Sequence, residues 1–185
     1  MSAAAWATGA FALNDFLGWS DLVARQEDGR IKPFVVGLLG RWRVNPAMRA
    51  LPLGEAGRRL LRDGAPWYED WVGHPDSTDE YWRSVRQTAA LDRVQIPVLL
   101  MTGWQDLFVE QTLYQYRHLR ARGVDPALTV GPWTHGQIAV NGAGEATRES
   151  LDWLAEHLGG GQVRRRSSPV RIFITGRGEW RDLPD

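Results

Sequence analysis

Two polar side chains follow directly after apolar runs in this sequence, and their types fit acid–base chemistry. Asp106 comes after the run in "IPVLLMTGWQD", and His135 comes after the run in "PALTVGPWTHG". An aspartate that accepts a hydrogen bond from one imidazole nitrogen fixes the tautomer, and it leaves the other nitrogen free to take a proton from a hydroxyl group. We therefore interpret Asp106 and His135 as the acid and the base of a hydrolytic site.

The nucleophile that such a pair would activate is not recognisable in the sequence. The chain has no cysteine, which excludes a cysteine nucleophile, a disulfide and a thiolate zinc site. Serine, threonine and carboxylate remain as candidates. None of the serines lies in a Gly-x-Ser-x-Gly elbow between a strand and a helix: Ser2, Ser20, Ser77, Ser84, Ser150, Ser167 and Ser168. We expect the nucleophile and the oxyanion donors to lie in a segment upstream of Met1, so that this chain alone is inactive.

The elements that must position Asp106 and His135 are a strand, a helix and a second strand. Residues 96–103 and 126–131 are continuous apolar runs of the length of buried parallel strands. Residues 107–123 between them have apolar side chains at helical spacing and end on a glycine. Because the carboxyl ends of parallel strands meet at one edge of a sheet, we expect Asp106 and His135 to lie within hydrogen-bonding distance.

The spacing of apolar residues changes along the chain and predicts three regions of an α/β fold. Residues 1–92 have mainly helical spacing, and only "PFVVGLL" has the pattern of a short strand. Residues 93–163 contain the crossover and a last helix. Residues 168–185 alternate apolar and polar side chains, which is typical of an exposed or sandwich-type strand and indicates the start of a separate β domain.

The last helix of residues 93–163 carries three leucines on one face: Leu151, Leu154 and Leu158. A helix with one apolar face normally buries that face against the rest of the domain. We expect this face to cover the sheet.

The charge and the apolar runs of the sequence limit the kinds of partner that the protein can have. The 22 basic and 22 acidic residues give zero formal charge, which argues against a nucleic-acid partner or an anionic membrane. No apolar run approaches the roughly 20 residues that span a bilayer, and the first residues lack the basic leader and cleavage site of a signal peptide. We expect a cytoplasmic protein without a membrane partner.

The other histidines offer weaker chemistry. His74 has Asp76, Asp79 and Glu80 nearby in the sequence, which admits a metal site, but one histidine on a loop favours a structural role and we expect no metal. His118 and His157 lie on helices, where we expect both at the surface.

Four phrases of the sequence resemble, in a similar order, those of the α/β-hydrolase family of cocaine esterase and the X-Pro dipeptidyl-peptidases. They are "HPDSTDEYW", "PVLLMTGWQDLFVEQTLYQYRHLR", "LTVGPWTHG" and "VRIFITGRGEWRD". The resemblance implies that Asp106 is the triad acid, that His135 is the base, and that Trp19 and Phe108 line the acyl side of the substrate pocket. It also implies a partial α/β-hydrolase sheet, a helical cap in residues 1–92 and the start of a C-terminal jelly roll in residues 168–185.

Two hypotheses of different classes follow. The first is a serine hydrolase of a small-molecule ester or a short peptide that needs no cofactor, in which Asp106 and His135 serve a serine from the missing N-terminal hydrolase segment. The second is a non-catalytic module that acts as an interaction surface. A dehalogenase-type or epoxide-hydrolase-type site fits less well, because its carboxylate nucleophile would also precede the acid.

Overall fold

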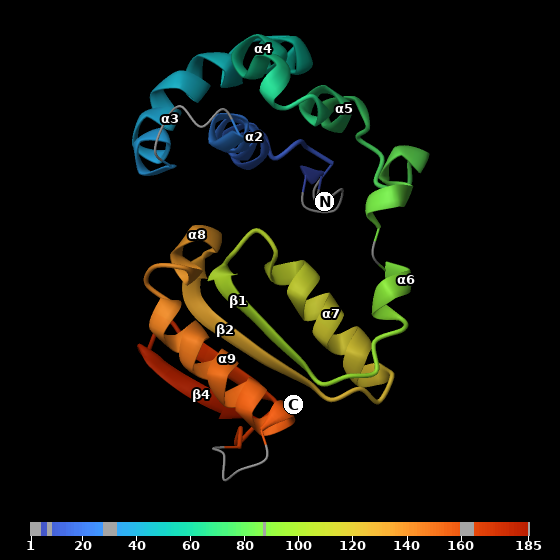
Figure 1. Ribbon diagram of the computed structural model, residues 1–185, viewed down its shortest axis with the longest axis vertical. Helices are drawn as coiled ribbons and strands as arrows, with labels where there is room; N and C mark the ends of the chain where they lie inside the picture. The colour runs from blue at the N-terminus through green and yellow to red at the C-terminus, as the bar shows by residue number, and fades with distance from the viewer. Residues whose placement is uncertain (1–4, 7–8, 28–32, 87, 160–164, 185) are drawn as a thin grey trace. The chain divides into compact units, whose positions relative to one another are not determined.

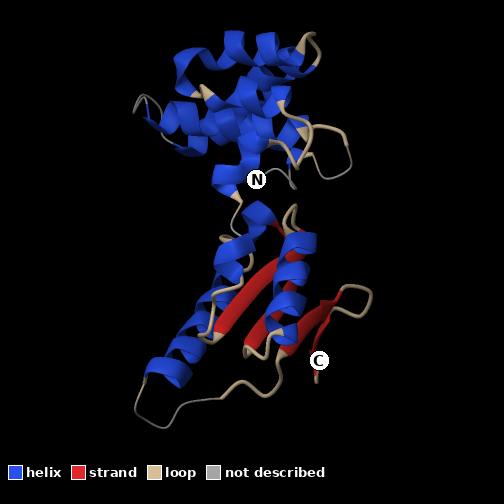
Figure 2. Cartoon of the chain, turned by 90° about the vertical axis from the view of Figure 1, so that its right-hand side faces the viewer, coloured by secondary structure: helices blue, strands red, loops and turns tan. Residues whose placement is uncertain are grey.

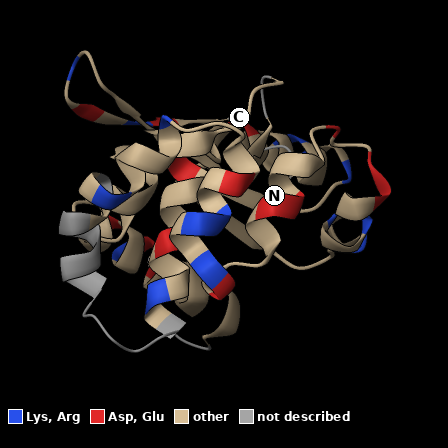
Figure 3. Ribbon diagram, turned by 90° about the horizontal axis from the view of Figure 1, so that it is seen from above, with Lys and Arg blue, Asp and Glu red and all other residues tan. Residues whose placement is uncertain are grey.

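The chain forms two compact units, Met1–Arg86 and Gln87–Asp185. The computed structural model describes the following residues (Figure 1): 5–6, 9–27, 33–86, 88–159 and 165–184. The boundary between the units falls after Arg86, whereas the sequence pattern places it after residue 92, because the short helix α6 (Thr88–Leu91) belongs to the second unit. Acidic and basic residues are interspersed along the helices (Figure 3).

Among its described residues, the first unit consists of helices joined by turns and loops and has no strand (Figure 2). Its α-helices and 3₁₀-helices are α2 (Leu13–Glu27), α3 (Pro33–Met48), α4 (Leu53–Leu61), η1 (Arg62–Gly64), α5 (Trp67–Gly73) and η2 (Glu80–Val85). Across the described parts of both units, no helix is long and apolar enough to cross a membrane.

One face of α2 supplies much of the core of the first unit. Five of its residues are buried at the spacing of one helix side: Phe16, Leu17, Ser20, Asp21 and Ala24. The Asp21 carboxylate accepts hydrogen bonds from Arg25 at 3.1 Å and from Arg43 at 2.8 Å. These partners compensate for the burial of its charge.

The short strand predicted for "PFVVGLL" is wrong, because this segment opens α3 (Pro33–Met48). A short apolar run has the same pattern in a buried strand and in a buried helix, and only the length of the whole element separates them. The helix begins at a proline, whose fixed φ suits the first helical position.

The second unit is built on a four-stranded sheet with the strand order β1-β2-β3-β4. Its strands are β1 (Val98–Gln105), β2 (Pro126–Thr134), β3 (Val170–Ile174) and β4 (Glu179–Leu183), and its further helices are α7 (Val109–Ala121), α8 (His135–Ile138) and α9 (Ala143–Leu158). Strands β1, β2 and β3 are parallel, and β4 is antiparallel to β3. The predicted βαβ crossover is confirmed as β1-α7-β2.

The two faces of this sheet differ in chemistry, because successive residues of a strand point to opposite sides. Leu128 and Val130 of β2 pack with Tyr116 of α7 in an apolar core. Thr129 points the other way and donates a hydrogen bond to Glu149 of α9. The sheet therefore has an apolar face toward α7 and a partly polar face toward α9.

Helix α9 lies on the sheet as predicted, but not by the face that carries its leucines. Leu151, Leu154 and Leu158 are 62%, 50% and 82% exposed, whereas Glu149 of the same helix is 7% exposed. The helix turns its carboxylates to the sheet because guanidinium groups lie there to pair with them.

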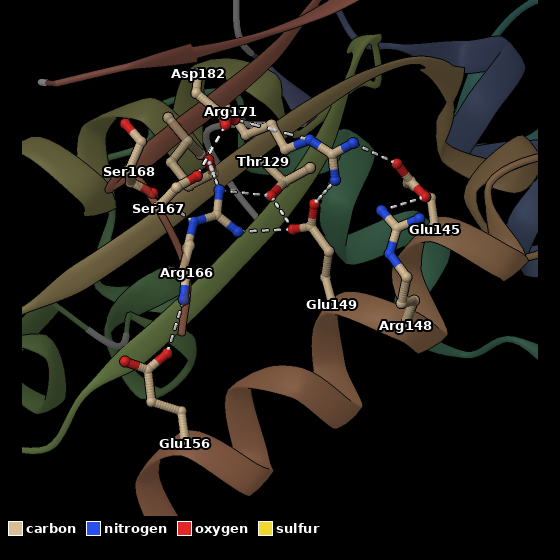
Figure 4. Close-up of polar contacts among 11 residues, drawn as sticks. Thr129, Glu145, Arg148, Glu149, Glu156, Arg166, Ser167, Ser168, Arg171 and Asp182 are labelled. Carbon is tan, nitrogen blue, oxygen red and sulfur yellow. Dashed lines mark hydrogen bonds and ion pairs between the residues drawn. The ribbon is translucent and has the colours of Figure 1, made fainter. Parts of the chain in front are cut away.

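Glu149 is the centre of a hydrogen-bonded network on this face (Figure 4). Its carboxylate accepts hydrogen bonds from Arg166, at 2.7 Å, and from Arg171 of β3. Arg166 also donates to the carbonyl oxygen of Leu128 at 2.8 Å. Burial alone would raise the pKa of Glu149, but the hydrogen bonds from Thr129 and the two arginines outweigh it and lower that pKa below its ordinary value.

The separate jelly-roll domain predicted to begin at residues 168–185 is not confirmed. Val170 and Ile172 of β3 lie beside Leu128 and Val130 of β2 in parallel register, so this segment extends the same sheet. The alternating pattern of residues 170–175 is explained by the two faces, since Val170 and Ile172 join the apolar core and Arg171 joins the network around Glu149.

We predict that Glu149→Gln destabilises the second unit by about 3 kcal/mol at pH 7, because it takes the carboxylate away from the largely buried guanidinium group of Arg166 and leaves that of Arg171 with Glu145 as its close partner. Hydrogen–deuterium exchange of β2 localises the effect to this unit.

The stabilisation by Glu149 should also depend on pH. The pKa of Glu149 is lower in the folded chain than its ordinary 4.5. Its stabilisation is therefore complete above that pH and is lost as the pH falls through the folded value.

The control is Glu179→Gln, which makes the same change of charge at an exposed position of the same sheet. We expect it to change stability by less than about 0.5 kcal/mol. Equal effects of the two substitutions, or a difference that does not shrink in acid, would contradict the role given to Glu149.

Candidate active site

The turns that carry Asp106 and His135 leave the sheet at the same edge (Figure 1). Asp106 directly follows β1, and His135 directly follows β2 as the first residue of α8. Because β1 and β2 are neighbouring parallel strands, their carboxyl ends lie side by side.

The structure brings the predicted acid and base together. Nδ1 of His135 lies 3.2 Å from Oδ1 and 3.3 Å from Oδ2 of Asp106, at the long end of the hydrogen-bonding range. The Asp106 side chain is only 4% exposed and that of His135 is 57% exposed. In this arrangement Nδ1 donates to the carboxylate, and Nε2 is left to accept a proton from a hydroxyl group.

Backbone groups of its own turn hold Asp106. The Phe108 N–H donates to Oδ1 of Asp106 at 2.9 Å, and the Asp106 N–H donates to the Gly103 carbonyl at 3.0 Å. The Asp106 carbonyl accepts from the N–H of Val109, the first residue of α7, at 3.1 Å. An aspartate that bonds the N–H two residues ahead is a common turn former. The carboxylate is thereby fixed at the start of the crossover helix.

The His135 turn is held by a capping box and by a ring contact. The side chain of Thr134 bonds the backbone of Gln137, and the side chain of Gln137 accepts from the Thr134 N–H at 3.0 Å. The Phe108 ring lies edge-to-face against the imidazole, with 5.1 Å between centroids and 77° between planes. Phe108 therefore touches the base as well as following the acid.

Trp19, the other predicted pocket residue, belongs to the first unit and is 42% exposed on α2. Its indole lies 5.7 Å from that of Trp71, with 24° between the planes, and 6.0 Å from that of Trp67. The three rings form an aromatic cluster of the helical unit, whereas Asp106, His135 and Phe108 are gathered in the second unit.

The other histidines have partners of their own. His74 Nδ1 lies 2.6 Å from the carbonyl oxygen of Asp70, and its ring stacks on that of Tyr81 at 4.2 Å. These contacts support the structural role predicted for His74. Nε2 of His118 lies 2.7 Å from Oδ1 of Asp92. In the described ranges, no group of three or more histidine, aspartate and glutamate side chains is placed to hold a metal ion.

Among the described residues of the second unit, the side-chain partners of the His135 imidazole are Asp106 and Phe108, and no serine is one of them. Ser20 is fully buried in α2, and Ser167 and Ser168 bond to β4. The arrangement is therefore an acid and a base without a nucleophile among these residues.

Sequence reasoning missed the packing of Trp133. Trp133, two residues before His135, is buried against glycines of two strands and of a turn. The sequence signal for this packing is the pair of glycines, Gly131 and Gly136, that flank "PWTH". Spacing alone does not show that the ring contacts Gly131 and not Gly136.

Comparison with known proteins gives evidence about the family of this chain that does not depend on the geometry of the site. Residues 1–137 match the family described as X-Pro dipeptidyl-peptidase (S15 family). The chain is 31% identical to a cocaine esterase of Rhodococcus sp. (strain MB1 Bresler) over 201 aligned positions, which cover 96% of this chain and 34% of the esterase.

A solved structure is similar as well. The crystal structure of an aminopeptidase from a marine sediment archaeon, Thaumarchaeota archaeon, superposes with a TM-score of 0.59 at 18% identity. It covers 76% of this chain and 26% of the aminopeptidase, so this likeness concerns the fold. The chain thus spans about a third of the length of the esterase and about a quarter of that of the aminopeptidase.

We predict that neutral His135 carries its proton on Nδ1, because Asp106 accepts there, whereas neutral His118 carries it on Nε2, because Asp92 accepts at that nitrogen. A ¹⁵N–¹H correlation spectrum of the histidine rings distinguishes the two tautomers. Asp106→Ala should move His135 to the Nε2–H tautomer and leave His118 unchanged. An Nε2–H tautomer of His135 in the unmodified chain would show that the contact with Asp106 is not the one described.

Proposed function

Because this chain belongs to the X-Pro dipeptidyl-peptidase (S15) family, we propose that it supplies the acid and the base of a Ser-Asp-His triad in a hydrolase of esters or amides. The observation that carries the proposal is the contact of buried Asp106 with half-exposed His135 at the carboxyl edge of two neighbouring parallel strands. Such edges are where α/β sheets bind ligands, and an α/β-hydrolase has its acid before its histidine along the chain.

Each residue has a defined task in this reaction. Nε2 of His135 takes the proton of a serine hydroxyl as its oxygen attacks the carbonyl carbon of the substrate. Asp106 holds the imidazole by Nδ1 and stabilises the imidazolium that forms. His135 then returns the proton to the leaving alcohol or amine, and a water molecule repeats the sequence on the acyl-enzyme.

The serine and the oxyanion donors come from a segment outside the 185 residues. The sequence contains no Gly-x-Ser-x-Gly elbow, and in the described sheet β1 pairs with β2 on one side only. A further parallel strand paired with the other side of β1 would end at the same edge as Asp106 and His135. This placement would bring a strand-end serine within reach of His135.

The substrate would enter a pocket lined by aromatic rings. We propose that Phe108, which lies beside the base, contacts the acyl group, and that Trp19 of the helical unit does so as well, as the resemblance to the family implies. Burial of apolar surface there would select a bulky acyl group at roughly 25 cal/mol per Å². An aryl or similar ester is therefore our preferred substrate class, with X-Pro amides as the competitor.

The alternative of a non-catalytic module has one observation in its favour. The exposed leucines of α9, at positions 151, 154 and 158, form an apolar strip of the kind that mediates protein contacts. The contact of Asp106 and His135 does not require this role and is left unexplained by it, so the hydrolase is preferred.

We predict that the intact protein that carries this chain hydrolyses p-nitrophenyl esters faster than X-Pro p-nitroanilides. His135→Ala should lower kcat by about 10⁴-fold or more, as removal of triad members does. His118→Ala, which changes a histidine of α7 with its own partner, should leave kcat within about twofold of the unmodified enzyme. An intact protein that keeps most of its esterase activity after His135→Ala would refute the assignment.

A second prediction concerns residues 1–185 by themselves. An acid and a base without a nucleophile or oxyanion donors have nothing to acylate, so this chain should show no turnover of p-nitrophenyl esters above buffer. The intact protein at the same concentration is the positive control. Turnover by the 185 residues that His135→Ala abolishes would show that the nucleophile lies within them.

A further inference from the structure

Trp133 lies two residues before the proposed base, in a cradle made by three glycines: Gly103, Gly131 and Gly142. Trp133 is 6% exposed. A Cβ atom at Gly131 would fall on the Trp133 ring, and a Cβ atom at Gly142 would lie 2.7 Å from the Cε2 atom of that ring. Only a hydrogen atom at these two positions leaves room for the indole.

The third glycine lets the backbone of Trp133 come close to β1. A Cβ atom at Gly103 would fall on the Trp133 carbonyl oxygen. Gly103 is the partner of Gly131, and Gln105 is the partner of Thr134, so β2 has one more residue than β1 between these pairs. This is a β-bulge, which re-aims side chains and is frequent next to active sites.

A second indole completes the surroundings of Trp133. The centroid of the Trp180 ring of β4 lies 5.7 Å from that of Trp133. The guanidinium carbon of Arg171 lies 4.5 Å from the centroid of Trp180, on its face. Arg171 is also bound to Glu149. The ring of Trp133 is therefore packed against residues of β2 and β4 and of the turn before α9, which leaves it little freedom to shift.

The His135 side chain, by contrast, has two described partners, the Asp106 carboxylate and the Phe108 ring. The side chain is half-exposed, and its contact with Asp106 is already at the long end of the hydrogen-bonding range. One residue, Thr134, separates His135 from Trp133. The position of the imidazole therefore depends strongly on its backbone, which the capping box holds on one side and the bulge and the Trp133 ring hold on the other.

We propose that Trp133, seated on Gly103, Gly131 and Gly142, is the positioning residue that holds His135 against Asp106. This inference rests on the proposed function, since it assigns a part in the same site. It requires no contact between Trp133 and the substrate, so the effect of moving its ring falls on kcat.

The first test compares two substitutions two residues apart. Gly142→Ala places a methyl group against the Trp133 ring, whereas a Cβ atom at Gly144 meets nothing within 4 Å. In the intact enzyme, Gly142→Ala should lower kcat about 100-fold, the loss expected from a misplacement of about 1 Å, with KM nearly unchanged. Gly144→Ala should change neither constant. Equal kcat values for the two variants would overturn the proposal.

A second readout needs no catalysis and separates this inference from the proposed function. In the ¹⁵N–¹H spectrum of the chain, Gly142→Ala should move His135 from the Nδ1–H tautomer toward Nε2–H, while His118 stays unchanged. If the intact protein shows no hydrolase activity but this shift occurs, the positioning role stands and the proposed function falls. If activity follows His135 but the tautomer is insensitive to Gly142→Ala, the positioning role falls alone.

Trp133→Phe tests the same role if Gly142→Ala fails to fold, because it adds no atoms to the core. The smaller ring should pack less tightly on Gly103, Gly131 and Gly142 and lower kcat about tenfold. In the Gly142→Ala background, Trp133→Phe should restore part of the lost rate, because it relieves the clash with the new methyl group. Protection of β2 amides from hydrogen exchange shows which variants keep the sheet. A folded Trp133→Phe variant with unchanged kcat and unchanged His135 tautomer would overturn the proposal.

Discussion

The parallel pairing of β1 with β2 is the constraint on which the candidate site depends. It brings residues 29 positions apart in the sequence to neighbouring turns at one edge of the sheet. Local turns hold each of the two side chains, but only the pairing of the strands brings these turns together. The crossover helix α7 joins the two strands, and residues at its start bind Asp106: the Phe108 N–H bonds the carboxylate and the Val109 N–H bonds the backbone carbonyl. The element that makes the pairing parallel therefore also orders the acid.

On the face of the sheet toward α9, ion pairs and hydrogen bonds take the place of apolar contacts. Glu149 pairs with Arg166 and Arg171, and Arg171 covers the Trp180 ring that packs on Trp133. A buried carboxylate with only one donor would cost stability, but here three donors satisfy it. This polar interface orients α9 with its leucines outward, and it supports the strand end that leads to the base.

The sequence predicted the parts of this fold that follow from length and local pattern. Continuous apolar runs predicted β1 and β2, and apolar residues at helical spacing before a glycine predicted α7. Together they predicted the meeting of Asp106 with His135. The sequence did not predict the helix at 33–48, because a seven-residue apolar run is ambiguous between strand and helix. Nor did it predict the orientation of α9, because a leucine strip indicates a buried face only when no stronger partner competes, and here the buried face binds two arginines.

The unequal burial of acid and base explains why one of them needs support from a distance. Asp106 can be buried because its own turn supplies hydrogen bonds, and burial keeps water from competing for the imidazole. His135 must stay open on the side of Nε2, because a hydroxyl group has to approach there. A base that gives up its own packing for access must take its position from the chain on either side. On one side the capping box of Thr134 and Gln137 provides that position, and on the other side a bulky indole fitted against glycines does so. The glycines at 103, 131 and 142 therefore contribute to the position of the base by leaving room for Trp133, although none of them carries a reactive group.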